Sequence, residues 1–99
     1  MKSVHLSNDS VMTGDELADG LLEFALALSR EQRVEVVELP VVDHEGAVQR
    51  ARFLVGGSIP LWTMTVDPNG TPELKDPDAR DELRRRTDQL ELEWLLPRG

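Results

Sequence analysis

The chain has 99 residues, of which 19 are acidic and 11 are basic, so its formal net charge is −8. It contains no cysteine, which excludes a disulfide framework, a zinc–thiolate site and a cysteine nucleophile. So negative a charge argues against binding to nucleic acid phosphates. The length fits one domain, and 39% hydrophobic with 30% charged residues is typical of a globular chain.

The N-terminal segment carries no targeting signal. Residues 1–12 include no apolar stretch, so no signal peptide is predicted, and residues 21–28 are too few to span a membrane. We expect residues 1–12 to form a flexible N-terminal arm and residues 13–97 to form a single domain. A cytoplasmic protein that does not bind a membrane is the simplest expectation.

Residues 13–32 have the pattern of an amphipathic helix. Thr13 and Glu16 have the spacing of a capping box at its start. Large apolar side chains then recur three and four residues apart, at Leu17, Leu21, Phe24 and Leu28. Further apolar residues widen this stripe, so the helix is expected to contact two neighbours, while its acidic side chains share the opposite side.

Three strands are predicted next, over residues 34–42, 47–55 and 58–66. Because Pro40 cannot donate to a ladder, the first of them should lie at an edge or bulge there. Residues 44–46 suit a three-residue hairpin loop with Gly46 in the left-handed conformation, and Gly56-Gly57 suits a two-residue turn. These turns predict an antiparallel three-stranded meander. Residues 71–74 form either a short fourth strand or a plain loop.

A second helix is predicted from residue 77 up to Pro97. Asp76 is placed to cap its start, and Pro77 suits the first helical position. The arginines at 84–86 have acidic neighbours four residues away, so we interpret them as surface ion pairs rather than phosphate ligands. The predicted fold class is therefore α+β, in the order α-β-β-β-α, with both helices packed on one face of the sheet.

Side-chain alternation divides this sheet into two faces. A three-residue loop pairs Glu38 with Arg52, and the resulting inner face carries Val37, Leu39, Val41, Ala51, Phe53 and Trp62. The opposite face is more apolar than the solvated face of an antiparallel sheet usually is, which is typical of an interface. Its interface candidates are Val34, Val36, Glu38, Arg50, Arg52, Leu54, Ile59 and Leu61. Alternatively, the arm or the tail at Leu95-Leu96 folds over this face.

Patterns for catalysis and metal binding are weak. His44 lies between two acidic residues of one tight turn, whose side chains do not converge, and His5 lies in the predicted arm. No serine has a nucleophile-elbow context. Trp62 and Trp94 are interpreted as core residues. We expect a protein that is not an enzyme and holds no metal or cofactor.

Three functions remain open at this level. The leading one is a protein-interaction module, a homodimer or a binder of another protein, that uses the interface candidates. The second is an acidic inhibitor or mimic that presents the carboxylates of the first helix to a basic partner. The third is a small-molecule binder or enzyme with a pocket between the helices and the Trp62 side of the sheet. Charge distinguishes the first helix from the interface candidates. The formal charges of residues 1–46 sum to −7, whereas residues 47–66 contain two arginines and no acidic residue.

Overall fold

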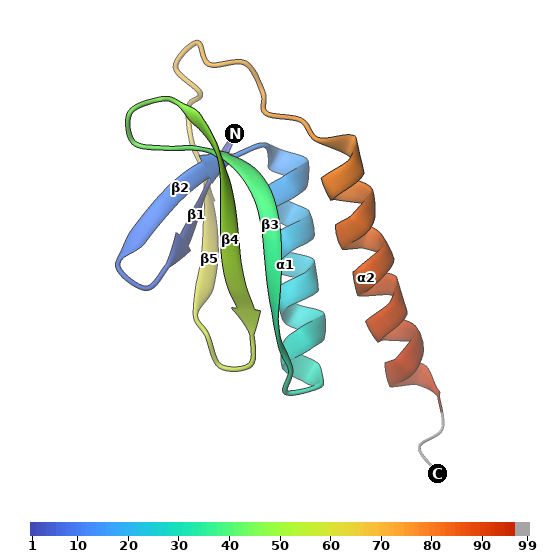
Figure 1. The fold of residues 1–99 in the computed structure, drawn as a ribbon. Helices are drawn as coiled ribbons and strands as arrows, with labels where there is room; N and C mark the ends of the chain where they lie inside the picture. The colour runs from blue at the N-terminus through green and yellow to red at the C-terminus, as the bar shows by residue number, and fades with distance from the viewer. Residues whose placement is uncertain (97–99) are drawn as a thin grey trace.

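The computed structural model describes residues 1–96 as one five-stranded antiparallel sheet and two helices (Figure 1). The predicted α+β class is confirmed, with two more strands than expected. The elements are β1 (Lys2–Leu6), β2 (Asp9–Thr13), α1 (Asp15–Arg30), β3 (Val34–Val42), β4 (Val48–Gly56), β5 (Leu61–Thr65) and α2 (Pro77–Leu95). Residues 71–74 form a loop.

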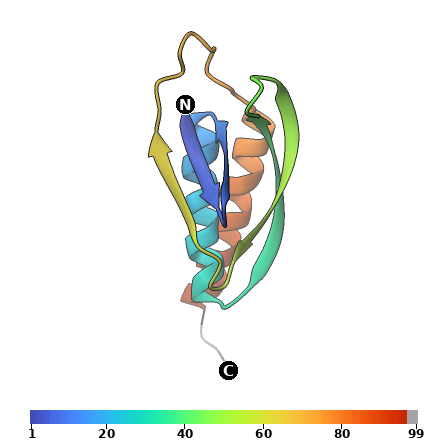
Figure 2. The same cartoon turned by 90° about the vertical axis from the view of Figure 1, so that its left-hand side faces the viewer.

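The N-terminal segment is not a flexible arm, and that prediction is wrong. It forms the hairpin β1–β2, and β1 lies inside the sheet, whose strand order is β4-β3-β2-β1-β5. Val4 is 1% exposed and belongs to the core. Successive side chains of a strand point to opposite sides, so its neighbours Ser3 and His5 point to the side of the sheet away from the helices. In Figure 2 the hairpin lies between β5 on one side and β3–β4 on the other, with both helices behind it.

The β3–β4 hairpin has the predicted register. Glu38 pairs with Arg52, the Asp43 N–H donates to the Ala47 carbonyl at 2.9 Å, and Gly46 has a φ of 84°. The three-residue loop therefore closes as expected and directs the valines and leucine at 37, 39 and 41 into the core. Local turn chemistry and side-chain alternation were sufficient to predict this pairing.

The predicted pairing of the second and third strands is wrong. Gly56 and Gly57 do turn the chain, with φ values of 102° and 59°, but β5 then pairs with β1 instead of β4. As a result β4 and β5 are the two edges of the sheet. Trp62, predicted to face inward, lies on the outer side and is 53% exposed. Trp94 is also not a core residue, since it is half exposed near the end of α2.

The start of α1 is capped by a distant residue. Thr13 is buried and its hydroxyl donates to the Pro40 carbonyl at 2.9 Å, so the predicted capping box does not form. Instead the Asp15 N–H donates to a Glu73 carboxylate oxygen at 2.7 Å, and the N-terminal ammonium lies 3.0 Å from both the Asp15 and the Glu73 carboxylates. These contacts lower the pKa of Glu73 and raise the pKa of the ammonium.

The core lies between α1 and the sheet, and α2 packs beside α1 (Figure 1). Gly20 permits this close approach, because a Cβ there would lie 3.3 Å from a methyl carbon of Leu83. The Asp76 side chain accepts a hydrogen bond from the Ala79 N–H, and Pro77 follows it, as predicted. The predicted stop at Pro97 lies outside the described residues. Within residues 1–96, no helix is long and apolar enough to cross a membrane.

Candidate interaction surfaces

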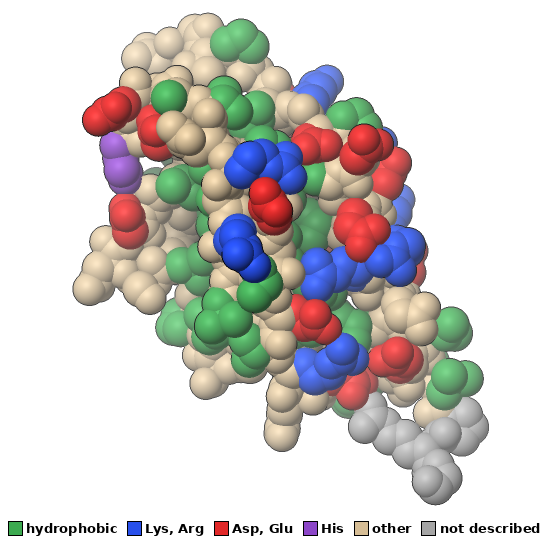
Figure 3. Space-filling model, viewed as in Figure 1, with side chains coloured by type: hydrophobic (Ala, Val, Ile, Leu, Met, Phe, Trp, Pro, Cys, Tyr) green, Lys and Arg blue, Asp and Glu red, His purple; other side chains and the backbone are tan. Residues whose placement is uncertain are grey.

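Six of the interface candidates share the outer face of the β3–β4 hairpin. We call this set of residues the outer face: Val34, Val36, Glu38, Arg50, Arg52 and Leu54. Val36 lies opposite Leu54, and the three apolar members remain 46–55% exposed. Figure 3 shows this side of the molecule, with hydrophobic side chains beside a short row of alternating charges. The part of the predicted apolar patch that belongs to β3 and β4 is therefore present, around its polar centre.

The polar centre of the outer face is only partly paired. The Arg50 guanidinium donates to a Glu38 carboxylate oxygen at 3.2 Å and to Asp76, the N-cap of α2, also at 3.2 Å. This link joins β4, β3 and α2. Arg52 stands opposite Glu38 in the ladder but forms no ion pair or hydrogen bond with another side chain of the described residues. One guanidinium on the face thus remains available.

Two interface candidates do not belong to this face. Leu61 starts β5, pairs with Leu6 and packs against the core. Ile59 is half-buried in the connection from β4 to β5. Both were assigned to the face through the β4–β5 pairing, which does not form, so their placement is corrected here.

Neither of the expected covers lies over the outer face. The N-terminal segment is part of the sheet, where β2 meets β3 through the single pair Met12–Val42. Leu95 and Leu96 are themselves exposed at the end of α2, which points away from the sheet (Figure 1). Among residues 1–96, nothing therefore covers the outer face.

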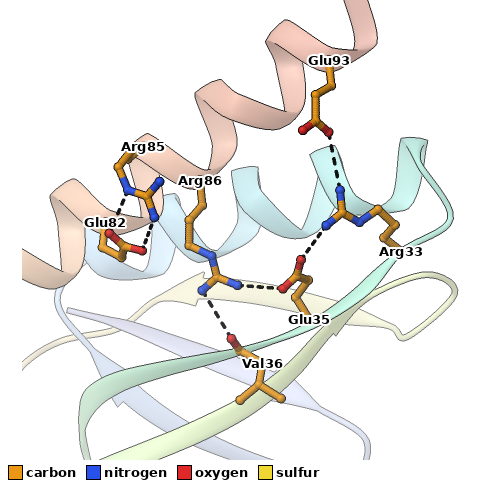
Figure 4. Close-up of polar contacts among 7 residues, drawn as sticks. All are labelled: Arg33, Glu35, Val36, Glu82, Arg85, Arg86 and Glu93. Atoms are coloured by element: carbon orange, nitrogen blue, oxygen red, sulfur yellow. Dashed lines mark hydrogen bonds and ion pairs between the residues drawn. The ribbon is translucent and has the colours of Figure 1, made fainter. Parts of the chain in front are cut away.

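A second feature, a groove of about 390 Å³, separates β3 from α2. Its lining residues include Val36, Glu38, Leu39 and Arg52 from the hairpin and Ala79, Leu83 and Arg86 from α2. Arg86 crosses the groove: its guanidinium donates to the Val36 carbonyl at 3.3 Å and to Glu35 at 3.1 Å (Figure 4), and lies 4.5 Å from the centre of the Phe24 ring. The surface-pair interpretation is therefore wrong for Arg86, although Arg85 does pair along the helix, with Glu82.

Both histidines face one shallow hollow of about 400 Å³, which no sequence pattern predicts. The His5 ring stacks on Trp62 with 3.7 Å between ring centres, and His44 Nε2 lies 3.0 Å from an Asp9 carboxylate oxygen. This hydrogen bond lowers the pKa of Asp9, aided by the Ser10 N–H. No group of three histidine or carboxylate side chains suited to a metal ion occurs among residues 1–96.

The structure gives less support to the other two functions. Acidic residues at the start of α1 already face cations, because Asp15 lies beside the N-terminal ammonium, Glu16 beside Arg80 and Asp19 beside Lys2. The space between α1 and the sheet is occupied by core side chains such as Phe24 and Leu39, and Trp62 lies outside it.

Comparison of the chain with protein-family models, with curated proteins and with solved structures finds no match. The functional argument therefore rests on the surfaces themselves.

Proposed function

We propose that the protein is a non-enzymatic interaction module that forms a homodimer through the outer face. The observation that carries this proposal is the half-exposed cluster of Val34, Val36 and Leu54, which lies on a regular two-stranded hairpin and is not covered by any part of residues 1–96. Apolar side chains grouped in this way on a sheet are typical of a surface that is buried by a partner.

Charge makes the outer face the place where two copies repel each other least. The chain has a net charge of −8, so two copies repel each other in most orientations, whereas residues 47–66 contain Arg50 and Arg52 and no acidic residue. The outer face also carries Glu38 beside the free Arg52. A two-fold axis that lies in the interface, parallel to the strands, turns the two outer faces toward each other and lets Arg52 of each copy meet Glu38 of the other. This is the self-complementarity that an isologous interface needs.

The test compares two exposed leucines. Leu54 is 55% exposed on the outer face and Leu26 is 56% exposed on α1. We expect sedimentation velocity to give a mass that rises with concentration for the wild type, and Leu54→Glu to weaken association by at least about tenfold, because a carboxylate would be buried in the interface. Leu26→Glu makes the same chemical change elsewhere and should leave association unchanged.

A strictly monomeric wild type over the whole concentration range would overturn the proposal. It would also fail if Leu54→Glu, with an unchanged circular dichroism spectrum, associated as strongly as the wild type. Leu61 is unsuited to this test because it packs against the core, so its substitution would unfold the chain.

A further inference from the structure

The edge of β3 that faces α2 lacks a neighbouring strand. The Asp43–Ala47 hydrogen bond fixes which residues bond across the hairpin, so the peptide groups of Val36, Glu38 and Pro40 point away from β4. On that side β2 pairs with β3 only at Val42. Several backbone donors and acceptors of β3 therefore face the groove and α2.

This open edge is short and has defined ends. At one end Arg86 donates to the Val36 carbonyl, and at the other the Thr13 hydroxyl donates to the Pro40 carbonyl. Pro40 has no N–H to satisfy. Between these ends the N–H and the carbonyl of Glu38 have no strand partner, and neither has the Val36 N–H just before the first end. At about 3.3 Å per residue, this length matches four or five residues of an extended chain.

The groove beside this edge has an apolar wall and one cation without an ion-pair partner among the described residues. Ala79 and Leu83 of α2 stand across from the strand. Of the charged lining residues, Glu38 is held by Arg50 and Glu82 by Arg85, with Glu82 oxygens 2.6 and 3.0 Å from the Arg85 nitrogens. Arg52 is the lining cation that has no such partner in the described part of the chain. A ligand that fits this groove supplies a carboxylate.

We infer that the β3–α2 groove binds an extended peptide segment that carries an acidic residue, added as a strand to the free edge of β3. Main-chain hydrogen bonds to Val36 and Glu38 supply sequence-independent affinity, and side chains on one side of the peptide contact Ala79 and Leu83. The peptide carboxylate pairs with Arg52. This site lies between β3 and α2 and does not require the dimer proposed above. Both would engage Arg52, so the peptide competes with the Glu38–Arg52 pairs of that dimer.

The experiment selects from a displayed library of random heptapeptides on the immobilised full chain, and repeats the selection on Leu54→Glu. We expect enrichment of peptides that contain Asp or Glu and lack a central proline. For the most enriched peptide, fluorescence anisotropy should show at least about a tenfold loss of affinity for Arg52→Glu. The matched control is Arg84→Glu, which makes the same charge change on the α1 side of α2 and should bind normally.

Backbone methylation of the peptide distinguishes strand addition from binding through side chains alone. N-methyl groups placed one at a time should weaken binding at alternate positions, because only every second peptide group faces β3. A uniform response to methylation, equal affinity for Arg52→Glu, or the absence of any enriched acidic peptide would overturn the inference. Binding by Leu54→Glu that is at least as tight as by the wild type would support this site even if the proposed dimer fails.

Discussion

At the scale of single residues, Gly56 decides where the chain leaves β4. Its φ of 102° is unfavourable for other residues, and a Cβ there would lie 2.3 Å from the Arg33 carbonyl oxygen and 2.8 Å from the Leu28 Cβ. We therefore expect Gly56→Ala to lower the free energy of unfolding by at least about 2 kcal/mol, since strain and overlap act together. Urea denaturation followed by circular dichroism measures this loss.

Gly46 provides the matched control for that prediction. It also has a positive φ, of 84°, but no atom lies within 4 Å of the position that its Cβ would occupy. Gly46→Ala should therefore lower the free energy of unfolding by only about 1 kcal/mol, which is the cost of a positive φ for a residue with a side chain. If the two variants lost the same free energy of unfolding, the overlap of the added Cβ with Arg33 and Leu28 would not contribute to the effect of Gly56→Ala.

At the scale of elements, Arg86 joins three segments that are distant in sequence. It extends from α2 to the Phe24 ring on α1 and to Glu35 and the Val36 carbonyl on β3. Because its side chain is mostly buried, Arg86→Ala should lower the free energy of unfolding by about 2 kcal/mol. Arg86→Lys should restore little, since an ammonium cannot donate in two directions while it covers the ring.

Arg85, the preceding residue, provides the control for Arg86. It pairs only with Glu82 on the same exposed helix surface. Arg85→Ala should therefore change the free energy of unfolding by less than about 0.5 kcal/mol. Thermal and urea unfolding of the two variants should separate them clearly. A similar small effect for both would show that Arg86 does not fix α2 against the hairpin.

The elements also show how far sequence reasoning can reach in this chain. The β3–β4 register follows from the three-residue loop at 44–46 and from the alternation of apolar and polar side chains along both strands. The sequence alone therefore predicts the pairing of Glu38 with Arg52. By contrast, β5 pairs with a strand that lies more than fifty residues earlier, and no local pattern encodes such a choice. The same limit explains why Leu61 was assigned to the wrong face and why Trp62 was expected inside.

The groove and the histidine hollow were missed for the same reason. Arg86 has acidic neighbours on its own helix, yet its partners lie on β3. His5 and His44 are about forty residues apart and meet only because β1 lies inside the sheet. Residue types near one another in sequence predicted both helices and three of the five strands, but not the local β1–β2 hairpin. Sites formed between distant elements required the structure.

At the scale of the whole molecule, the net charge of −8 opposes self-association, and it does so least at the outer face, whose charged residues are Glu38, Arg50 and Arg52. Added salt shortens the screening length from about 30 Å at 0.01 M to about 8 Å at 0.15 M, which reduces repulsion between two acidic copies. The apolar contact among Val34, Val36 and Leu54 is not weakened by this change. We therefore expect the dimer dissociation constant to fall as sodium chloride rises from 0.02 to about 0.3 M. Sedimentation equilibrium at several salt concentrations measures the constant directly.

An acidic mimic bound to a basic partner would respond to salt in the opposite sense, because its attraction to that partner would be screened. Self-association that weakens with salt would show that Glu38–Arg52 pairs across the interface outweigh both the apolar contact and the repulsion.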